Sequence, residues 1–137
     1  MLKNLEQLIL SANFKDAEAF YHKMDFQQFH DQLISIANDN HNMINYTFLL
    51  YLLMKEESAK LHNLAFSLFV NALTPIEGAY HCALFHAQRA VELTNEQDTF
   101  SLEHLLLLNI GGISNMLHPT IKQFSHHDNN STCQLGF

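Results

Sequence analysis

The chain has 137 residues, of which 47% are hydrophobic, so it is long enough and apolar enough to bury a core and is not a disordered polypeptide. Four Gly and two Pro are too few for an architecture of strands and tight turns, which needs turn residues every ~8–12 positions. The net charge of −7, with the ten His taken as neutral, repels phosphate and anionic lipid, so nucleic acid and membrane surfaces are poor partners for this chain.

Apolar residues recur at helical spacing along the first half of the chain. A short helix carries Leu2, Leu5, Leu8 and Ile9 and ends near Asn13. Asn13 or Asp16 caps the next helix, which runs to Met24. Asp25 and Gln28 have the spacing of a capping box, and the helix that they begin is stopped by residues 38–40. From about residue 42 to 56 the pattern is apolar nearly all round, which predicts a helix in the middle of the structure.

The second half predicts three or four further helices. Ser58 caps a fifth helix that ends near Ala72. Thr74, Pro75 and Glu77 have the order of a cap, a first helical residue and a capping-box partner, so a sixth helix is expected to begin there. Its apolar face holds small residues that let a neighbouring helix approach closely: Ile76, Tyr80, Ala83, Ala87 and Ala90.

Residues 94–98 end this sixth helix, and a seventh follows over residues 100–108. Gly111-Gly112 is a strong stop, and residues 113–124 could form a last helix that Pro119 interrupts or starts. We therefore predict an all-α fold of seven or eight helices in a single domain, residues 1–124, with residues 125–137 as a disordered tail. Short loops favour antiparallel helical hairpins, arranged as a compact bundle or a short solenoid.

Ten histidines invite a metal or catalytic hypothesis. Glu77 and His81 are four residues apart on the predicted sixth helix and could face one metal ion, and His126-His127 could collect metal adventitiously. The chain has no HExxH or CxxC motif, no nucleophile elbow and no phosphate-binding glycine loop. We therefore expect no catalytic, cofactor-binding or metal-binding residues and no enzyme activity, and a small helical enzyme or metal protein stays a third possibility.

Cysteine usage and the apolar segments bear on the compartment. Cys82 and Cys133 do not make a disulfide framework, which fits a reducing cytosol. The N-terminus lacks the basic region of a secretory signal, and the longest apolar block, residues 46–54, is far short of the ~20 residues of a membrane span. We expect a cytoplasmic protein.

Acidic residues gather toward predicted helix ends and loops in the later half of the chain. Such a cluster is either plain solvated surface or a patch that steers a basic partner. The residues that we single out as candidate partner contacts are Glu56, Glu57, Glu77, Glu92, Glu96 and Asp98.

Tyr80, Ala83, Ala87, Ala90 and Leu93 have a spacing that resembles the second helix of a tetratricopeptide repeat. That family prefers a bulky residue where Ala87 stands, and it closes near a proline where this chain has Asn95. The resemblance covers some 20 residues and implies a helical-repeat architecture.

A broader likeness spans residues 1 to about 110. The segments MLKNLEQLIL, NYTFLLYLLMKEESAKLHNLAFSLF, IEGAYHCALFHAQRAVELT and SLEHLLLL resemble small helical immunity proteins of bacterial polymorphic toxin systems. The resemblance implies a cytoplasmic protein that binds a cognate toxin domain, in many cases a nuclease with a basic cleft, and occludes its active site. The alternative is a helical-repeat adaptor that binds another protein or peptide.

Overall fold

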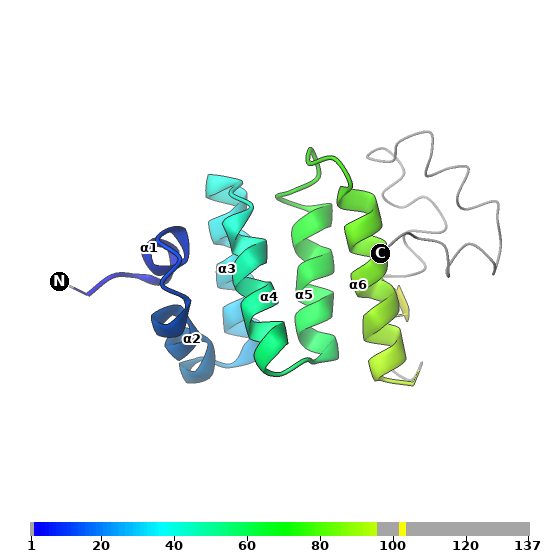
Figure 1. Cartoon of the computed structure of the whole chain (residues 1–137), viewed down its shortest axis with the longest axis horizontal. Helices are drawn as coiled ribbons and strands as arrows, with labels where there is room; N and C mark the ends of the chain where they lie inside the picture. The colour runs from blue at the N-terminus through cyan, green and yellow to red at the C-terminus, as the bar shows by residue number, and fades with distance from the viewer. Residues whose placement is uncertain (1, 96–101, 104–137) are drawn as a thin grey trace.

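A computed structural model describes residues 2–95 and 102–103 of the chain. Over these residues the protein is all-helical (Figure 1), with no strand. The six helices are α1 (Leu5–Leu10), α2 (Phe14–Lys23), α3 (Phe26–Asn40), α4 (Ile44–Lys55), α5 (Ala59–Val70) and α6 (Ala79–Leu93). Of the predicted seventh helix only residues 102–103 are described, and both are helical. The predicted last helix and the tail lie outside the described residues.

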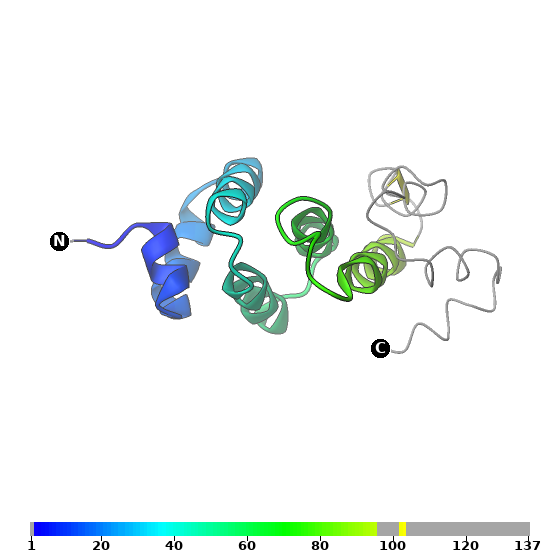
Figure 2. The ribbon, with the colours of Figure 1, turned by 90° about the horizontal axis from the view of Figure 1, so that it is seen from above.

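The four longer helices, α3 to α6, run alternately up and down, as expected from their short connections (Figure 1). Seen along their axes they zigzag between two rows, with α3 and α5 in one and α4 and α6 in the other (Figure 2). The short helices α1 and α2 cover the side of this array that is away from α6. One continuous hydrophobic core runs through all six helices.

Two of the predicted N-terminal caps are confirmed. The Asp25 carboxylate accepts a hydrogen bond from the backbone N–H of Gln28 at 2.9 Å, and the Gln28 side chain accepts one from the N–H of Asp25 at 3.3 Å. The Ser58 hydroxyl accepts the N–H of Leu61 at 3.1 Å. These side chains satisfy N–H groups that the first turn of α3 and α5 leaves unpaired, which sets where each helix begins.

Two helix boundaries differ slightly from the sequence prediction, and one predicted cap residue makes no capping hydrogen bond. Helix α1 begins at Leu5 and not near Leu2, because Asn4 forms a capping box with Gln7 that the sequence analysis did not identify. Asn13 is the N-cap residue of α2, but its side chain donates to Asp16 and makes no capping hydrogen bond. Helix α3 continues through the predicted stop to Asn40, and the chain then turns at His41, whose φ is +52°.

The predicted start of the sixth helix is wrong. Residues 71–77 form turns, and α6 begins at Ala79, after Gly78 in the left-handed conformation at φ +87°. The hydroxyl of Thr74 donates to the carbonyl of Asn71 at 3.5 Å and does not cap a helix. A backbone at φ +87° cannot belong to a right-handed helix, and glycine adopts it without a steric cost. The glycine therefore ends the turn region and sets the start of α6.

The alanine-rich face of α6 is buried as predicted. Ala83, Ala87 and Ala90 are fully inaccessible to solvent, and Tyr80 on the same face is buried with them. Of all helix pairs, α5 and α6 make the most extensive contact. Small side chains at a helix interface allow the two backbones to approach closely, so this face fixes α6 against α5.

Helix α4 lies between α3 and α5 in the array (Figure 1), but it is not enclosed on all sides. Phe48, Leu49 and Leu52 lie in the core, but Leu50 and Met54 on the opposite side are exposed. Within the described part of the chain, none of the helices combines the length and the apolar character that crossing a bilayer requires.

Candidate functional site

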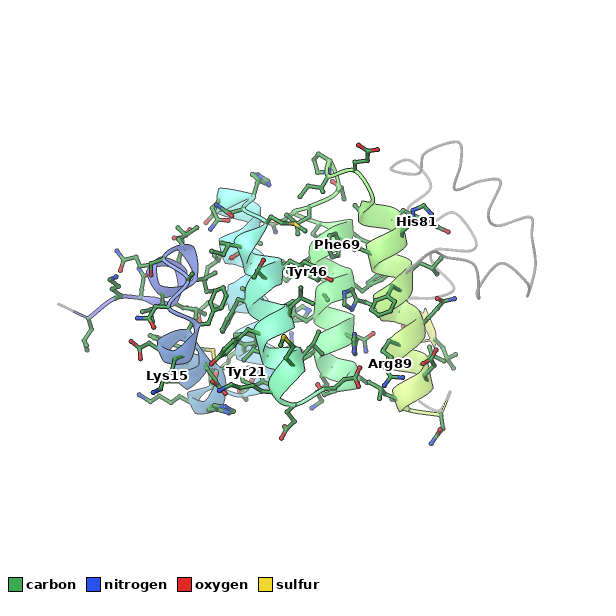
Figure 3. All side chains as sticks on the ribbon, viewed as in Figure 1. Lys15, Tyr21, Tyr46, Phe69, His81 and Arg89 are labelled. Carbon is green, nitrogen blue, oxygen red and sulfur yellow. The ribbon has the colours of Figure 1, made fainter. Side chains whose placement is uncertain are left out.

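Three of the six predicted acidic residues lie at one end of the molecule, and we call this group, Glu56, Glu57 and Glu92, the acidic end. Glu56 and Glu57 follow α4 in the connection to α5, and Glu92 lies in the last turn of α6 beside the labelled Arg89 (Figure 3). Glu77 is not part of this group, because it lies in the α5–α6 connection at the opposite end of α5 (Figure 1). Glu96 and Asp98 lie outside the described residues.

Arg89 links two residues of the acidic end, Glu57 and Glu92. Its guanidinium donates two hydrogen bonds to the Glu57 carboxylate, from Nε to Oε2 at 2.8 Å and from Nη2 to Oε1 at 2.9 Å. A third donor, Nη1, reaches the Glu92 carboxylate at 2.9 Å. The fork of a guanidinium matches the two oxygens of a carboxylate, which makes this geometry specific to arginine. The α4–α5 connection is thereby tied to α6.

A chain of polar side chains leads from Glu57 into the core. Glu57 Oε2 lies 2.8 Å from His62 Nε2, and His62 Nδ1 lies 2.8 Å from His86 Nδ1. The other ring nitrogen of His86, Nε2, lies 2.9 Å from the hydroxyl of Tyr46. His62 belongs to α5, His86 to α6 and Tyr46 to α4. These hydrogen-bonded side chains therefore link three helices to the α4–α5 connection, which holds Glu57. We call these four residues the His62–His86 chain.

Both imidazoles are buried, His62 at 4% and His86 at 1% of full exposure. Burial lowers the pKa of His86 to about 3, and the neighbouring His62 adds to that effect. Burial also lowers the pKa of His62, although the hydrogen bond to Glu57 opposes it. At neutral pH both rings are therefore uncharged. Arg89, and secondly His62, lower the pKa of Glu57 to about 2, so the carboxylate is ionised.

Aromatic rings surround the buried imidazoles. The ring of Phe69 stacks on His86 with an interplanar angle of 12°, and Phe85 meets His86 edge-on with centroids 5.1 Å apart. Tyr46 contacts Phe69 edge-on at 4.7 Å, and both lie between α4 and α6 (Figure 3). Burial raises the pKa of Tyr46 to about 12, so its hydroxyl keeps its proton. The apolar surroundings keep water from the two imidazoles.

The His62–His86 chain was not predicted from the sequence. One signal was present, because His86 lies three residues after Ala83 and four before Ala90, on the face predicted to be buried. A histidine on a buried helix face needs hydrogen-bond partners. No spacing rule connects it to His62, which is 24 residues earlier on another helix.

Glu77 and His81 do not have the helical spacing on which their pairing as metal ligands was based. Glu77 precedes α6 and His81 lies within it, so the two do not share the face of one helix. Among the described residues, no three His, Cys, Asp or Glu side chains converge as metal ligands. Cys82 has a free thiol and is only partly buried.

A second surface runs along the outer side of α4, where Met43, Leu50 and Met54 are 39%, 37% and 87% exposed. With the exposed Thr47 between them, these residues recur at steps of four, three and four, which places them on one side of the helix. We call Met43, Leu50 and Met54 the α4 stripe. It ends two residues before Glu56, so the stripe and the acidic end are continuous along the chain.

Comparisons of this chain with protein-family models, with curated proteins and with solved structures gave no match.

Proposed function

We propose that this protein binds another protein and acts by covering part of its surface, as an immunity protein covers the active site of a toxin domain. The observation that carries the proposal is the α4 stripe, an apolar line on an exposed helix face that leads to the acidic end. No residue is assigned a chemical step. Inhibition follows from occlusion of the partner's active site.

The α4 stripe has the properties of an interface centre. Met54 leaves almost its whole side chain in water, and Leu50 lies one turn before it on the same side. Exposed apolar groups in a contiguous line are typical of sites that bury against a partner, and methionine adapts its shape to different surfaces. A partner that covers α4 would remove these side chains from water.

The acidic end indicates which charge a partner would carry. Glu56, Glu57 and Glu92 carry three negative charges against the one positive charge of Arg89, and the whole chain carries −7. This sign favours a partner with a basic surface, such as the cleft of a nuclease, which binds phosphate. Electrostatic attraction of this kind mainly accelerates association, whereas the buried apolar centre slows dissociation.

Co-expression with the product of the adjacent gene, followed by co-purification, would identify the partner. Leu50→Asp and Met54→Asp are then compared with the wild type by calorimetry. We expect each substitution to weaken binding at least tenfold, because it places a charge in the buried centre of the interface. Leu10→Asp is the matched control, since Leu10 is also exposed but lies on α1. Equal affinities for all four proteins would exclude the α4 stripe as the interface.

The salt dependence tests the charge argument separately. The association rate should fall as ionic strength rises, while the dissociation rate changes little, because screening acts on the encounter of the two proteins. Association rates that are the same at low and high salt would contradict steering by the acidic end, even for a genuine partner.

The alternative function is a helical-repeat adaptor for a protein or peptide of the cell itself. The two-row zigzag of α3 to α6 and the tetratricopeptide-like spacing of α6 favour it (Figure 2). Gene context separates the two functions. A toxin-like reading frame directly upstream supports immunity, whereas a gene without such a neighbour supports the adaptor.

A further inference from the structure

The direction of every hydrogen bond in the His62–His86 chain follows from the Glu57 carboxylate. An ionised carboxylate can only accept, so His62 donates to it from Nε2. A neutral imidazole has one N–H, so Nδ1 of His62 must accept and Nδ1 of His86 must donate. Nε2 of His86 then accepts from the Tyr46 hydroxyl. In the neutral state each contact has one donor and one acceptor, and all donors point toward the acidic end.

One added proton reverses the direction of two of these hydrogen bonds, the one between His62 and His86 and the one between His86 and Tyr46. A proton on His62 Nδ1 makes that atom a donor, so His86 must present a bare Nδ1 and carry its own proton on Nε2. Nε2 then donates to the oxygen of Tyr46, and the tyrosine hydroxyl proton turns away. His62, now an imidazolium, stays paired with Glu57. The chain therefore accommodates one proton by exchanging the tautomer of His86.

A second proton cannot be accommodated. If both imidazoles are charged, two N–H groups face each other across the 2.8 Å between the Nδ1 atoms, and two positive charges repel in an apolar surrounding. The rings must then move apart. Because they belong to α5 and α6, this motion separates the two helices beside the acidic end.

The charged and titratable groups near His62 and His86 do not prevent the two rings from moving apart when both are protonated. Glu57 and Glu92 attract a proton to His62, whereas Arg89 repels one, and His62 in turn repels a proton from His86. Tyr46, which faces His86 from α4, is neutral and has the partly buried Cys82 near it. The charged and titratable groups that face the pair therefore include Glu57, Arg89 and Glu92 on the His62 side and Tyr46 on the His86 side.

We propose that Tyr46, His86, His62 and Glu57 form a proton-sensitive latch, which fastens α4, α5 and α6 together while the imidazoles are neutral and releases them when both take up protons. The latch regulates the acidic end, so its biological role rests on the proposed function. Protonation adds positive charge beside Glu57 and frees α6, and both changes weaken the attraction for a basic partner. Binding is therefore strong at neutral pH and is lost in acid.

The first test is made on the full chain without any partner, so it is independent of the proposed function. Two-bond proton–nitrogen correlation spectra of ¹⁵N-histidine-labelled protein report the tautomer and charge of each ring. At pH 7.5 we expect His62 with its proton on Nε2 and His86 with its proton on Nδ1. The opposite tautomers, or a buried ring that titrates near the ordinary histidine value of about 6.5, would overturn the latch.

Glu57→Gln and Glu92→Gln form a matched pair of variants. Each removes one carboxylate from Arg89, but only Glu57 also contacts His62. An amide can donate or accept, so Glu57→Gln should leave the direction of the chain undetermined and give mixed His62 and His86 tautomers. Glu92→Gln should keep single tautomers. Unchanged tautomers in Glu57→Gln would show that the carboxylate does not set the order, and the latch would be rejected.

The second test uses the identified partner at pH 7.5 and pH 3.0, because His86 takes up its proton only near its pKa of about 3. The wild-type affinity should fall at least tenfold at pH 3.0, and a combined His62→Gln and His86→Gln variant that still binds at pH 7.5 should lose less. If the spectra confirm the latch but the affinity is the same at both pH values, the latch does not regulate binding. If no partner is found, the spectra still decide whether the latch exists.

Discussion

The side-chain amide of Asn45, at the start of α4, donates to the side-chain oxygen of Asn40, at the end of α3, over 2.8 Å. The same amide also donates to the carbonyl of Asn42 at 2.8 Å. Asn45 is completely buried, so these two bonds stand in for water that it cannot reach. The turn between α3 and α4 is therefore held from inside the protein.

We predict that Asn45→Ala destabilises the protein by about 1–3 kcal/mol, because it removes both hydrogen bonds that the buried amide donates and takes this donor from the Asn42 carbonyl. Urea unfolding monitored by circular dichroism measures the change. Thr47→Ala, an exposed position on the same helix, is the control and should have a small effect. Equal stabilities of the two variants would mean that Asn45 does not hold the turn.

Ala87→Phe should destabilise the fold by about 1–3 kcal/mol, because a larger side chain at a fully buried position forces α5 and α6 apart. Ala19→Phe makes the same change at an exposed position on α2 and should cost much less. Urea unfolding again provides the measurement. Unaltered unfolding of Ala87→Phe would contradict the close packing of this face.

Stability should decline as the solution becomes acidic, beginning near pH 6.5. The folded protein holds His62 and His86 with lowered pKa values, so the unfolded chain binds more protons in acid and is favoured there. The stability of the fold with neutral imidazoles is therefore fully present above pH 6.5, and it is lost as the pH falls toward about 3, the pKa of His86. From pH 7.5 to 5.0 the free energy of unfolding should fall by about 2 kcal/mol for His86 alone, and the lowered pKa of His62 adds to this fall.

Urea unfolding at a series of pH values measures this slope. Thr47→Ala is the control, because it changes an exposed position and removes no titratable group. The combined His62→Gln and His86→Gln variant should have a flatter dependence over the same range. A wild-type stability that is constant from pH 7.5 to 5.0 would show that the buried pair takes up protons freely in the folded state.

Arg89→Ala should lower the urea midpoint, and the difference from the wild type should shrink at high salt. The substitution removes the donors to both Glu57 and Glu92, which leaves three negative charges close together at the acidic end. Salt screens the repulsion of such exposed charges. Lys15→Ala, which removes an exposed positive charge on α2, is the control and should leave the midpoint almost unchanged at either salt concentration. An effect of Arg89→Ala that does not depend on salt would point to lost packing and not to charge.

The helices themselves were largely predictable from the sequence. Short-range rules located the caps at Asp25 and Ser58 and the buried alanines of α6, because these features depend on residues three or four positions apart. The same rules failed at Thr74. The sequence there has the spacing of a capping box, but no helix begins at Thr74 in the structure. The competing conformation of Gly78 depends on how the turn packs, and local spacing does not report it.

The candidate site required the tertiary structure. The sequence indicated Glu57 and Glu92 as surface acids, but it gave no reason to join them through Arg89 or to extend the group to His62 and His86. It also described α4 as apolar nearly all round without telling which side would stay exposed. Helical periodicity determined which residues share a face of one helix, and therefore an all-helical chain with a buried alanine face. Which faces meet, and which polar groups are buried together, was decided by the packing of helices distant in sequence, because a buried hydrogen bond depends on distances in space and not on spacing along the chain.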